Sequence, residues 1–167
     1  SSFKNPNMQY NVTVHDSHTV PDIQLADYLF RITSMSKCTY RDLIVALVYI
    51  DILINNGTIS GISFHNVHRL LAISIMTSTK FFDDLSYSNK SWAKIMGIPL
   101  RELNNMEIQF LFSLQFDLHV KAETMNGWAE AIHKYNEGHQ SNTDISEDQN
   151  CSGMTNEVIA ADSPINL

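Results

Sequence analysis

Cysteine, glycine and proline are scarce in this chain of 167 residues, which contains two, six and four of them respectively. The cysteines, Cys38 and Cys151, lie far apart, so we expect neither a disulfide framework nor a zinc cluster of closely spaced ligands. The glycines form no GxGxxG or GxxxxGK(S/T) pattern, which argues against the common phosphate-binding loops. Because the two cysteines indicate no disulfide framework, we expect a reducing compartment and an intracellular protein of the cytoplasm, the nucleus or both.

Basic residues are absent from residues 137–167, which carry six acidic side chains. Residues 1–136 carry 12 acidic and 11 basic side chains, so the net charge of −7 at pH 7 belongs almost entirely to the tail. A near-neutral body lacks the basic surface that a phosphate backbone demands, and nucleic-acid binding is not expected. No apolar run approaches the roughly 20 residues of a membrane-spanning helix, so no membrane contact is expected either.

Apolar residues recur at helical spacing along most of the sequence, which predicts five or six helices and an all-α fold. Pro21 and Pro99 stand at expected helix starts, and Thr39 and Ser63 stand at expected N-caps. Gly97 stands at an expected helix end. The expected helices cover residues 21–32, 40–55, 63–83, 89–96, 100–116 and 122–135.

The segment of residues 63–83 is apolar nearly all round, which places it at the centre of the domain. The last part of the chain is polar, acidic and poor in aromatic residues, so it buries too little apolar surface to offset the entropy of ordering. We therefore expect an irregular arm over residues 1–20, one helical domain over residues 21–136, and a weakly packed or disordered acidic tail over residues 137–167.

Side chains that could form an active site or a metal site do not gather in the sequence. There is no GxSxG nucleophile elbow. His65 and His68 lie at i and i+3 of the expected third helix, but no cysteine or carboxylate nearby completes a ligand set. Asp83 and Asp84 are adjacent, point about 100° apart on a helix and cannot share a proton. We expect no catalytic residue, no metal and no cofactor, and hence a protein that is not an enzyme.

Four phrases resemble, in order, the cyclin box, the five-helix module of cyclins: VPDIQLADYLFRI, ALVYIDIL, NVHRLLAISIMTSTKFFDD and GIPLRELNNMEIQFLFSLQFDLHV. The sequence looks most like the Pho-type cyclins, also called P-type or U-type, from Pro21 to Tyr135. This resemblance implies five helices around a buried third helix, with one extra C-terminal helix. It also implies a subunit that binds and activates a Pho-type cyclin-dependent kinase, in phosphate signalling, carbon storage or the cell cycle. Such a subunit is a monomer when free and a heterodimer with the kinase.

The resemblance also implies which residues contact the kinase. In cyclins, the lysine of a K-F-x-(E/D) phrase ending the third helix and a glutamate on the fifth helix hydrogen-bond the kinase near its C helix. The matching residues are Lys80 and Glu107. An ammonium group has three donors and suits free carbonyls, and a neighbouring carboxylate holds its long side chain in place. The further expected contacts are apolar ones from Phe81 and Phe82 and ionic ones from Asp83 and Asp84.

Other interpretations of the same residues stay open at this point. Lys80 and Glu107 could form an ordinary surface ion pair, worth under about 1 kcal/mol. A cyclin box can also serve as a scaffold that binds transcription machinery, or as a helical interaction protein without a kinase. Because a helix turns about 100° per residue, Phe81 and Phe82 are not expected to point outward together.

Overall fold

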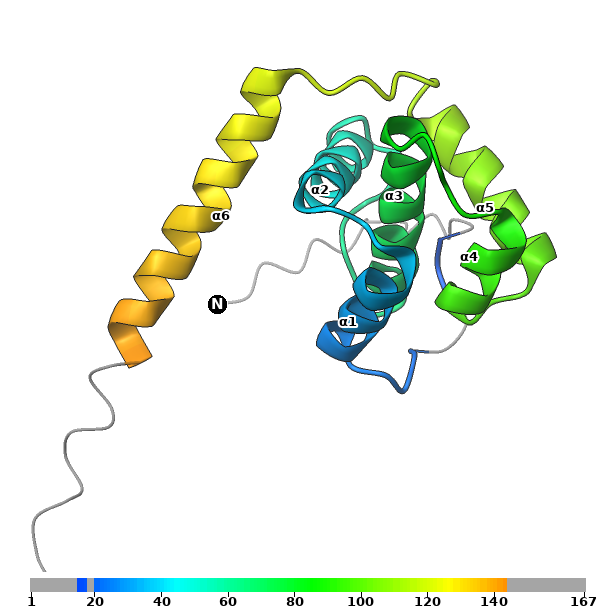
Figure 1. Cartoon of the computed structure of the whole chain (residues 1–167), viewed down its shortest axis with the longest axis horizontal. Helices are drawn as coiled ribbons and strands as arrows, with labels where there is room; N and C mark the ends of the chain where they lie inside the picture. Colours follow the sequence, from blue (N-terminus) through cyan, green and yellow to red (C-terminus); the bar gives the residue numbers. More distant parts are fainter. Residues whose placement is uncertain (1–14, 18–19, 144–167) are drawn as a thin grey trace, which may run out of the picture. The chain divides into compact units, whose positions relative to one another are not determined.

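The computed structural model describes residues 15–17 and 20–143, and within these residues the chain forms six α-helices and no strand (Figure 1). The contacts divide the chain into two compact units, residues 1–129 and 130–167, and the boundary falls within the last helix. The all-α prediction is confirmed. The helices are α1 (Leu25–Ser36), α2 (Tyr40–Asn55), α3 (Val67–Phe82), α4 (Asn89–Met96), α5 (Leu100–Ser113) and α6 (Ala122–Thr143).

Helix α3 is the centre of the first unit, as predicted from its apolar character. It contacts α1, α2, α4 and α5, and Figure 1 shows it enclosed by these four helices. Every residue from Ala72 to Thr79 is buried. The hydroxyl groups of this stretch all have partners: Ser74, Thr77 and Thr79 donate to carbonyls of the same helix, and Ser78 donates to Asp42 of α2. Buried polar side chains therefore cost little here, because each has a partner.

Two buried tyrosines join parts of the chain that are far apart in the sequence. The Tyr28 hydroxyl of α1 donates to the Met96 carbonyl of α4 at 3.2 Å, and the Tyr49 hydroxyl of α2 donates to the Leu118 carbonyl at 2.7 Å. Burial raises the pKa of Tyr28 to about 12 and raises that of Tyr49 as well. Both phenols therefore stay neutral donors throughout the physiological range.

The start of α1 differs from the prediction. Pro21 precedes the helix instead of opening it, and α1 begins at Leu25 after an extended Gln24. His68 accounts for the delay, because its Nε2 donates to the Ile23 carbonyl at 3.0 Å and holds this segment against α3. The buried face of α1 is Tyr28, Ile32 and Ser36, at a spacing of four residues.

The expected bounds of α2 and α4 and the expected starts of α5 and α6 are confirmed, whereas α1 ends at Ser36 instead of residue 32 and α5 ends at Ser113 instead of residue 116. Thr39 caps α2 in a reciprocal capping box with Asp42, and Gly97 ends α4 in the left-handed conformation, with a φ of 73°. Ser63 is not the cap of α3. Asn66 holds that position, and the backbone carbonyl of Ser63 accepts from the Asn66 amide at 3.1 Å.

Residues 15–17 pack on the helices, although the sequence suggested an irregular arm. His15 is buried and meets Phe110 edge to face, with ring centroids 5.8 Å apart. The Ser17 amide donates to the His65 carbonyl at 2.8 Å. At the other end, α6 continues past the expected end at Tyr135. The division into arm, domain and tail stays a prediction, since residues 1–14, 18–19 and 144–167 lie outside the described residues.

Buried His15 makes the stability of the fold depend on pH. Burial lowers the pKa of His15 to about 4, opposed by Asp16 and assisted by Arg69. The unfolded chain, with a histidine pKa near 6.5, binds more protons between these two values. Stability should therefore fall as the pH drops from about 6.5 to 4, by at most about 3 kcal/mol, and not further below that.

Urea unfolding at a series of pH values measures this loss. His15→Gln should flatten the profile between pH 6.5 and 4, whereas His119→Gln, at an exposed position, should leave it unchanged. An equally steep profile in the His15→Gln variant would show that other groups cause the acid sensitivity.

No helix in the described part of the chain has the length and apolar character needed to cross a membrane.

Candidate partner-binding site at the end of α3

Helix α3 is buried without interruption from Ala72 to Thr79 and reaches the surface at its last turn. Thr79 is still buried, Lys80 is partly exposed, and Phe81 is 47% exposed. A cation in the last turn of a helix also interacts favourably with the negative end of the helix dipole. The sequence therefore ends its central helix on a charge that is stable at the surface.

Lys80 and Glu107, predicted as a pair, lie together. The Lys80 Nζ is 2.6 Å from Glu107 Oε1, and only 25% of the lysine side chain and 17% of the glutamate side chain are exposed. Lys80 comes from α3 and Glu107 from the middle of α5. The packing of two helices thus fixes a half-buried ion pair in one geometry.

Asn89, the first residue of α4, completes this pair, and sequence reasoning missed it. Its Oδ1 accepts from Lys80 Nζ, and its Nδ2 donates to Glu107 Oε2 at 2.5 Å and to Asn104 Oδ1 at 2.8 Å. The three side chains form a triangle contributed by α3, α4 and α5. No periodic or motif signal points to Asn89, since an asparagine at a helix start is common for local reasons alone.

The triangle leaves hydrogen-bonding capacity for a partner. Lys80 has three donors, and the described residues take two of them. Each Glu107 oxygen accepts one bond from within the triangle and has a further lone pair. The site can therefore offer one ammonium N–H to a carbonyl and accept one N–H, without breaking its own contacts.

The two phenylalanines separate into different roles. Phe82 is partly buried and packs against the core, whereas Phe81 stays exposed. Their rings meet edge to face, with centroids 4.8 Å apart and planes at 88°. Phe81 is therefore the apolar side chain beside Lys80 that a partner can reach.

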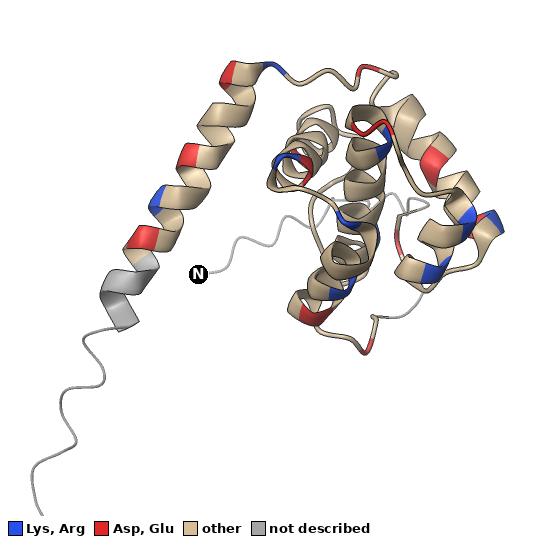
Figure 2. Cartoon of the chain, in the orientation of Figure 1, with Lys and Arg blue, Asp and Glu red and all other residues tan. Residues whose placement is uncertain are grey.

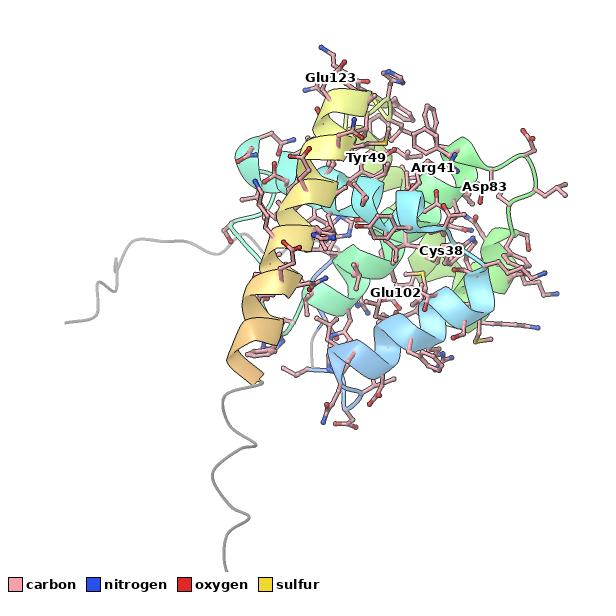
Figure 3. The ribbon with its side chains drawn as sticks, turned by 60° about the vertical axis from the view of Figure 1, so that its left-hand side comes forward. Cys38, Arg41, Tyr49, Asp83, Glu102 and Glu123 are labelled. Atoms are coloured by element: carbon pink, nitrogen blue, oxygen red, sulfur yellow. The ribbon has the colours of Figure 1, made fainter. Side chains whose placement is uncertain are left out.

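The two aspartates also differ. Asp83 ends α3, its amide donates to the Thr79 carbonyl at 3.0 Å, and its carboxylate Oδ1 lies 2.9 Å from Arg41 Nη2 of α2. Figure 3 shows Arg41 and Asp83 facing each other across the two helix ends. Asp84 is exposed and forms no ion pair with any residue that the structure describes. The sequence did not distinguish these two acids, because the role of Arg41 depends on how α2 packs on α3.

A second aromatic pair, in which both rings are exposed, lies at the C-terminal end of α5: Phe112 is in the helix and Phe116 follows it. Phe112 and Phe116 are 64% and 59% exposed, and their ring centroids are 5.2 Å apart. Gln115 and Phe116 both have positive φ angles, 54° and 57°, which are uncommon for residues other than glycine. The sequence did not predict that this pair is exposed, because apolar residues occupy more than one face of α5 and the pattern does not show which face is buried.

The histidine pair considered as a metal site holds backbone instead. His65 Nδ1 donates to the Ser17 carbonyl at 3.2 Å, and His68 bonds the Ile23 carbonyl. The described residues contain no group of three potential ligands that could hold a metal ion. Acidic and basic residues are distributed over several helices, with no continuous basic stripe along α1–α5 (Figure 2).

Comparison with known proteins relates this geometry to one family. The cyclin family model matches residues 2–118. The chain is 41% identical over 110 residues to Cyclin-U4-3 of Arabidopsis thaliana, covering 66% of this chain and 50% of that protein. It is 38% identical over 109 residues to Cyclin-P4-1 of Oryza sativa subsp. japonica, covering 65% of this chain and 51% of the rice protein.

A fungal protein extends the comparison. The PHO85 cyclin-like protein psl1 of Schizosaccharomyces pombe is 29% identical over 150 residues, covering 87% of this chain and 60% of that protein. The chain thus spans between half and three fifths of the length of these relatives. A family match over most of the sequence, relatives of the U and P types, and helices packed around a central α3 agree with one another: the chain belongs to the cyclin family.

Proposed function

We propose that this chain is the regulatory subunit of a Pho-type cyclin-dependent kinase, and that it binds and activates the kinase through the end of α3. The observation that carries the proposal is the triangle of Lys80, Asn89 and Glu107, half-buried where the central helix reaches the surface. Family membership and a relative named as a PHO85 cyclin-like protein support the kinase as the partner class.

The geometry of the triangle suits protein recognition better than fold stability. An exposed ion pair needs no third residue and contributes under about 1 kcal/mol. Here Asn89 holds both members, so the ammonium and the carboxylate lose little rotational freedom when a partner binds. Free carbonyls at the end of a helix or a loop of the kinase would take the remaining N–H donor of Lys80.

The neighbouring side chains supply the rest of the proposed interface. Phe81 offers an exposed aromatic anchor beside Lys80. Phe82 contributes mainly by holding Phe81, since it packs against the core. Asp83 and Asp84 add negative charge, which fits a basic group on the kinase. The proposed contact set is thus a central hydrogen-bonding triangle, an aromatic ring and an acidic edge.

Activation follows from the rigidity of such a surface. A protein kinase needs the ion pair between its strand lysine and its C-helix glutamate before it transfers phosphate. A preformed surface that contacts only the conformer with the C helix swung in shifts the kinase population toward that conformer. The chain needs no catalytic group of its own for this role.

Activity of a purified kinase tests the proposal. Adding the purified chain to a Pho-type cyclin-dependent kinase should raise phosphate transfer to a peptide substrate and form a one-to-one complex in size-exclusion chromatography. Mass spectrometry of proteins retained by the chain from its native lysate should identify the kinase itself. If the chain neither formed a complex with any Pho-type kinase nor stimulated its activity, the proposed function would be ruled out.

A further inference from the structure

Arg41 carries a positive charge at the start of α2, where a cation does not favour helix formation. It is the second residue of α2, so its charge opposes the positive end of the helix dipole. Its guanidinium instead faces three groups brought together by packing. Nη2 lies 2.9 Å from Asp83 Oδ1 and 3.5 Å from Asp42 Oδ1, and Cζ lies 4.8 Å from the centroid of the Phe82 ring. These contacts join the first turn of α2 to the last turn of α3.

One side of this arrangement is fixed by the fold. Asp42 is fully buried, and its carboxylate accepts from the Thr39 amide at 2.8 Å, the Thr39 hydroxyl at 2.7 Å and the Ser78 hydroxyl at 3.2 Å. Three hydrogen bonds fix the position of this carboxylate independently of Arg41. Asp42 therefore anchors Arg41, and Arg41 in turn acts on the end of α3.

The other side is the candidate binding surface itself. Arg41 covers the ring of Phe82 and pairs with Asp83, the two residues of the segment 81–84 that face the protein. Phe81 and Asp84, which it does not contact, are the two exposed members of the same segment. The side chains that a partner can reach are thus the two that Arg41 does not hold.

We propose that Arg41 is a positioning residue of the kinase-binding surface, which occupies Asp83 and leaves Asp84 as the acid that pairs with a basic group of the kinase. This inference rests on the proposed function and assigns different roles to two adjacent acids. A carboxylate already 2.9 Å from a guanidinium gains little from a second cation, whereas an exposed carboxylate gains the full interaction.

The free protein provides the first test. Hydrogen exchange of the Asp83 amide, which is bonded to the Thr79 carbonyl, reports how firmly the end of α3 is held. Arg41→Ala and Asp83→Asn should each speed this exchange, by roughly threefold to tenfold, and the double variant should add little. Arg101→Ala, an exposed arginine of α5, is the control and should change nothing. Unchanged exchange in Arg41→Ala would overturn the positioning role.

Binding to the purified kinase provides the second test. Asp84→Asn should weaken binding by roughly threefold to tenfold and reduce its dependence on salt, whereas Asp83→Asn should change the salt dependence little. In an Arg41→Ala background the loss caused by Asp84→Asn should shrink, because the released Asp83 can replace it. Arg41→Lys, which keeps the charge, should restore the larger loss.

Equal effects of the two aspartate substitutions, or an undiminished effect of Asp84→Asn in the Arg41→Ala background, would overturn the inference. A wild-type chain that binds no kinase would instead refute the proposed function. In that case the exchange experiment alone decides whether Arg41 holds the end of α3.

Discussion

Replacing Glu107 with alanine should weaken binding to the Pho-type kinase by on the order of 2–5 kcal/mol, a loss of about 30-fold to several thousand-fold. The loss is large because the substitution removes an acceptor and also leaves Lys80 without its 2.6 Å partner at an interface that closes over it. Lys80→Ala should have an effect of the same size, since it strands the carboxylate. Calorimetric titration of the purified kinase with each variant measures both losses.

The chain offers a closely matched control. Arg69 and Glu102 form a second ion pair between α3 and α5, nearer the first turns of both helices. Glu102→Ala removes a carboxylate from the same helix as Glu107 but lies outside the candidate surface. It should leave kinase binding within about twofold of wild type, while Glu107→Ala abolishes most of it. Comparable losses in the two variants would mean that general weakening of the α3–α5 packing, and not the triangle, explains the result.

The double variant separates a shared interaction from two independent ones. If Lys80 and Glu107 act as a unit, Lys80→Ala with Glu107→Ala should lose less binding energy than the two single losses added together. Asn89→Ala should fall between wild type and the single variants, because it frees the triangle without removing a charge. Full additivity would show that the two residues contact the kinase separately.

The parts of this site that could be predicted from the sequence are those that a local pattern or the family resemblance indicates. Other contacts between helices far apart in the sequence could not be predicted. The all-round apolar character of residues 63–83 was sufficient to place α3 at the centre, because only a buried helix tolerates it. The pairing of Lys80 with Glu107 followed from the resemblance to cyclins, since no local pattern relates residues on different helices. Asn89 and Arg41 had neither kind of signal: each acts through helix packing.

Local rules failed where tertiary contacts competed with them. Pro21 is a reasonable first residue of a helix, yet the bond from His68 to the Ile23 carbonyl keeps the chain extended for several residues more. Residues 15–17 have no helical or strand period, and the burial of His15 against Phe110 depends on a ring supplied by α5. Sequence periodicity describes how an element folds by itself, whereas these positions are set by what lies opposite.

Asp42 is the side chain whose loss should destabilise the fold most among the charged residues of α2. Its carboxylate closes the capping box with Thr39 and accepts from Ser78 of the central helix, and it is fully buried. Asp42→Ala removes two hydrogen bonds from Thr39, worth about 0.5–1.5 kcal/mol each, and leaves the buried Ser78 hydroxyl without this acceptor, at about 1–3 kcal/mol. Because these costs are partly shared, we expect the free energy of unfolding to fall by about 2–4 kcal/mol.

Urea unfolding at pH 7 measures that loss, and Asp51→Ala provides the comparison. Asp51 lies on the same helix, but its carboxylate accepts only an exposed bond from Asn55, at 3.0 Å, among the hydrogen bonds of the described residues. Its removal should therefore cost about 0.5 kcal/mol or less. Asp42→Asn keeps one acceptor oxygen and should lie between the two. If Asp42→Ala shifted the urea midpoint no more than Asp51→Ala does, the capping box and its bond to Ser78 would contribute nothing beyond an ordinary surface contact. The junction of α2 and α3 would then depend on apolar packing alone, and Arg41 would lack the fixed anchor through which it is proposed to hold the end of α3.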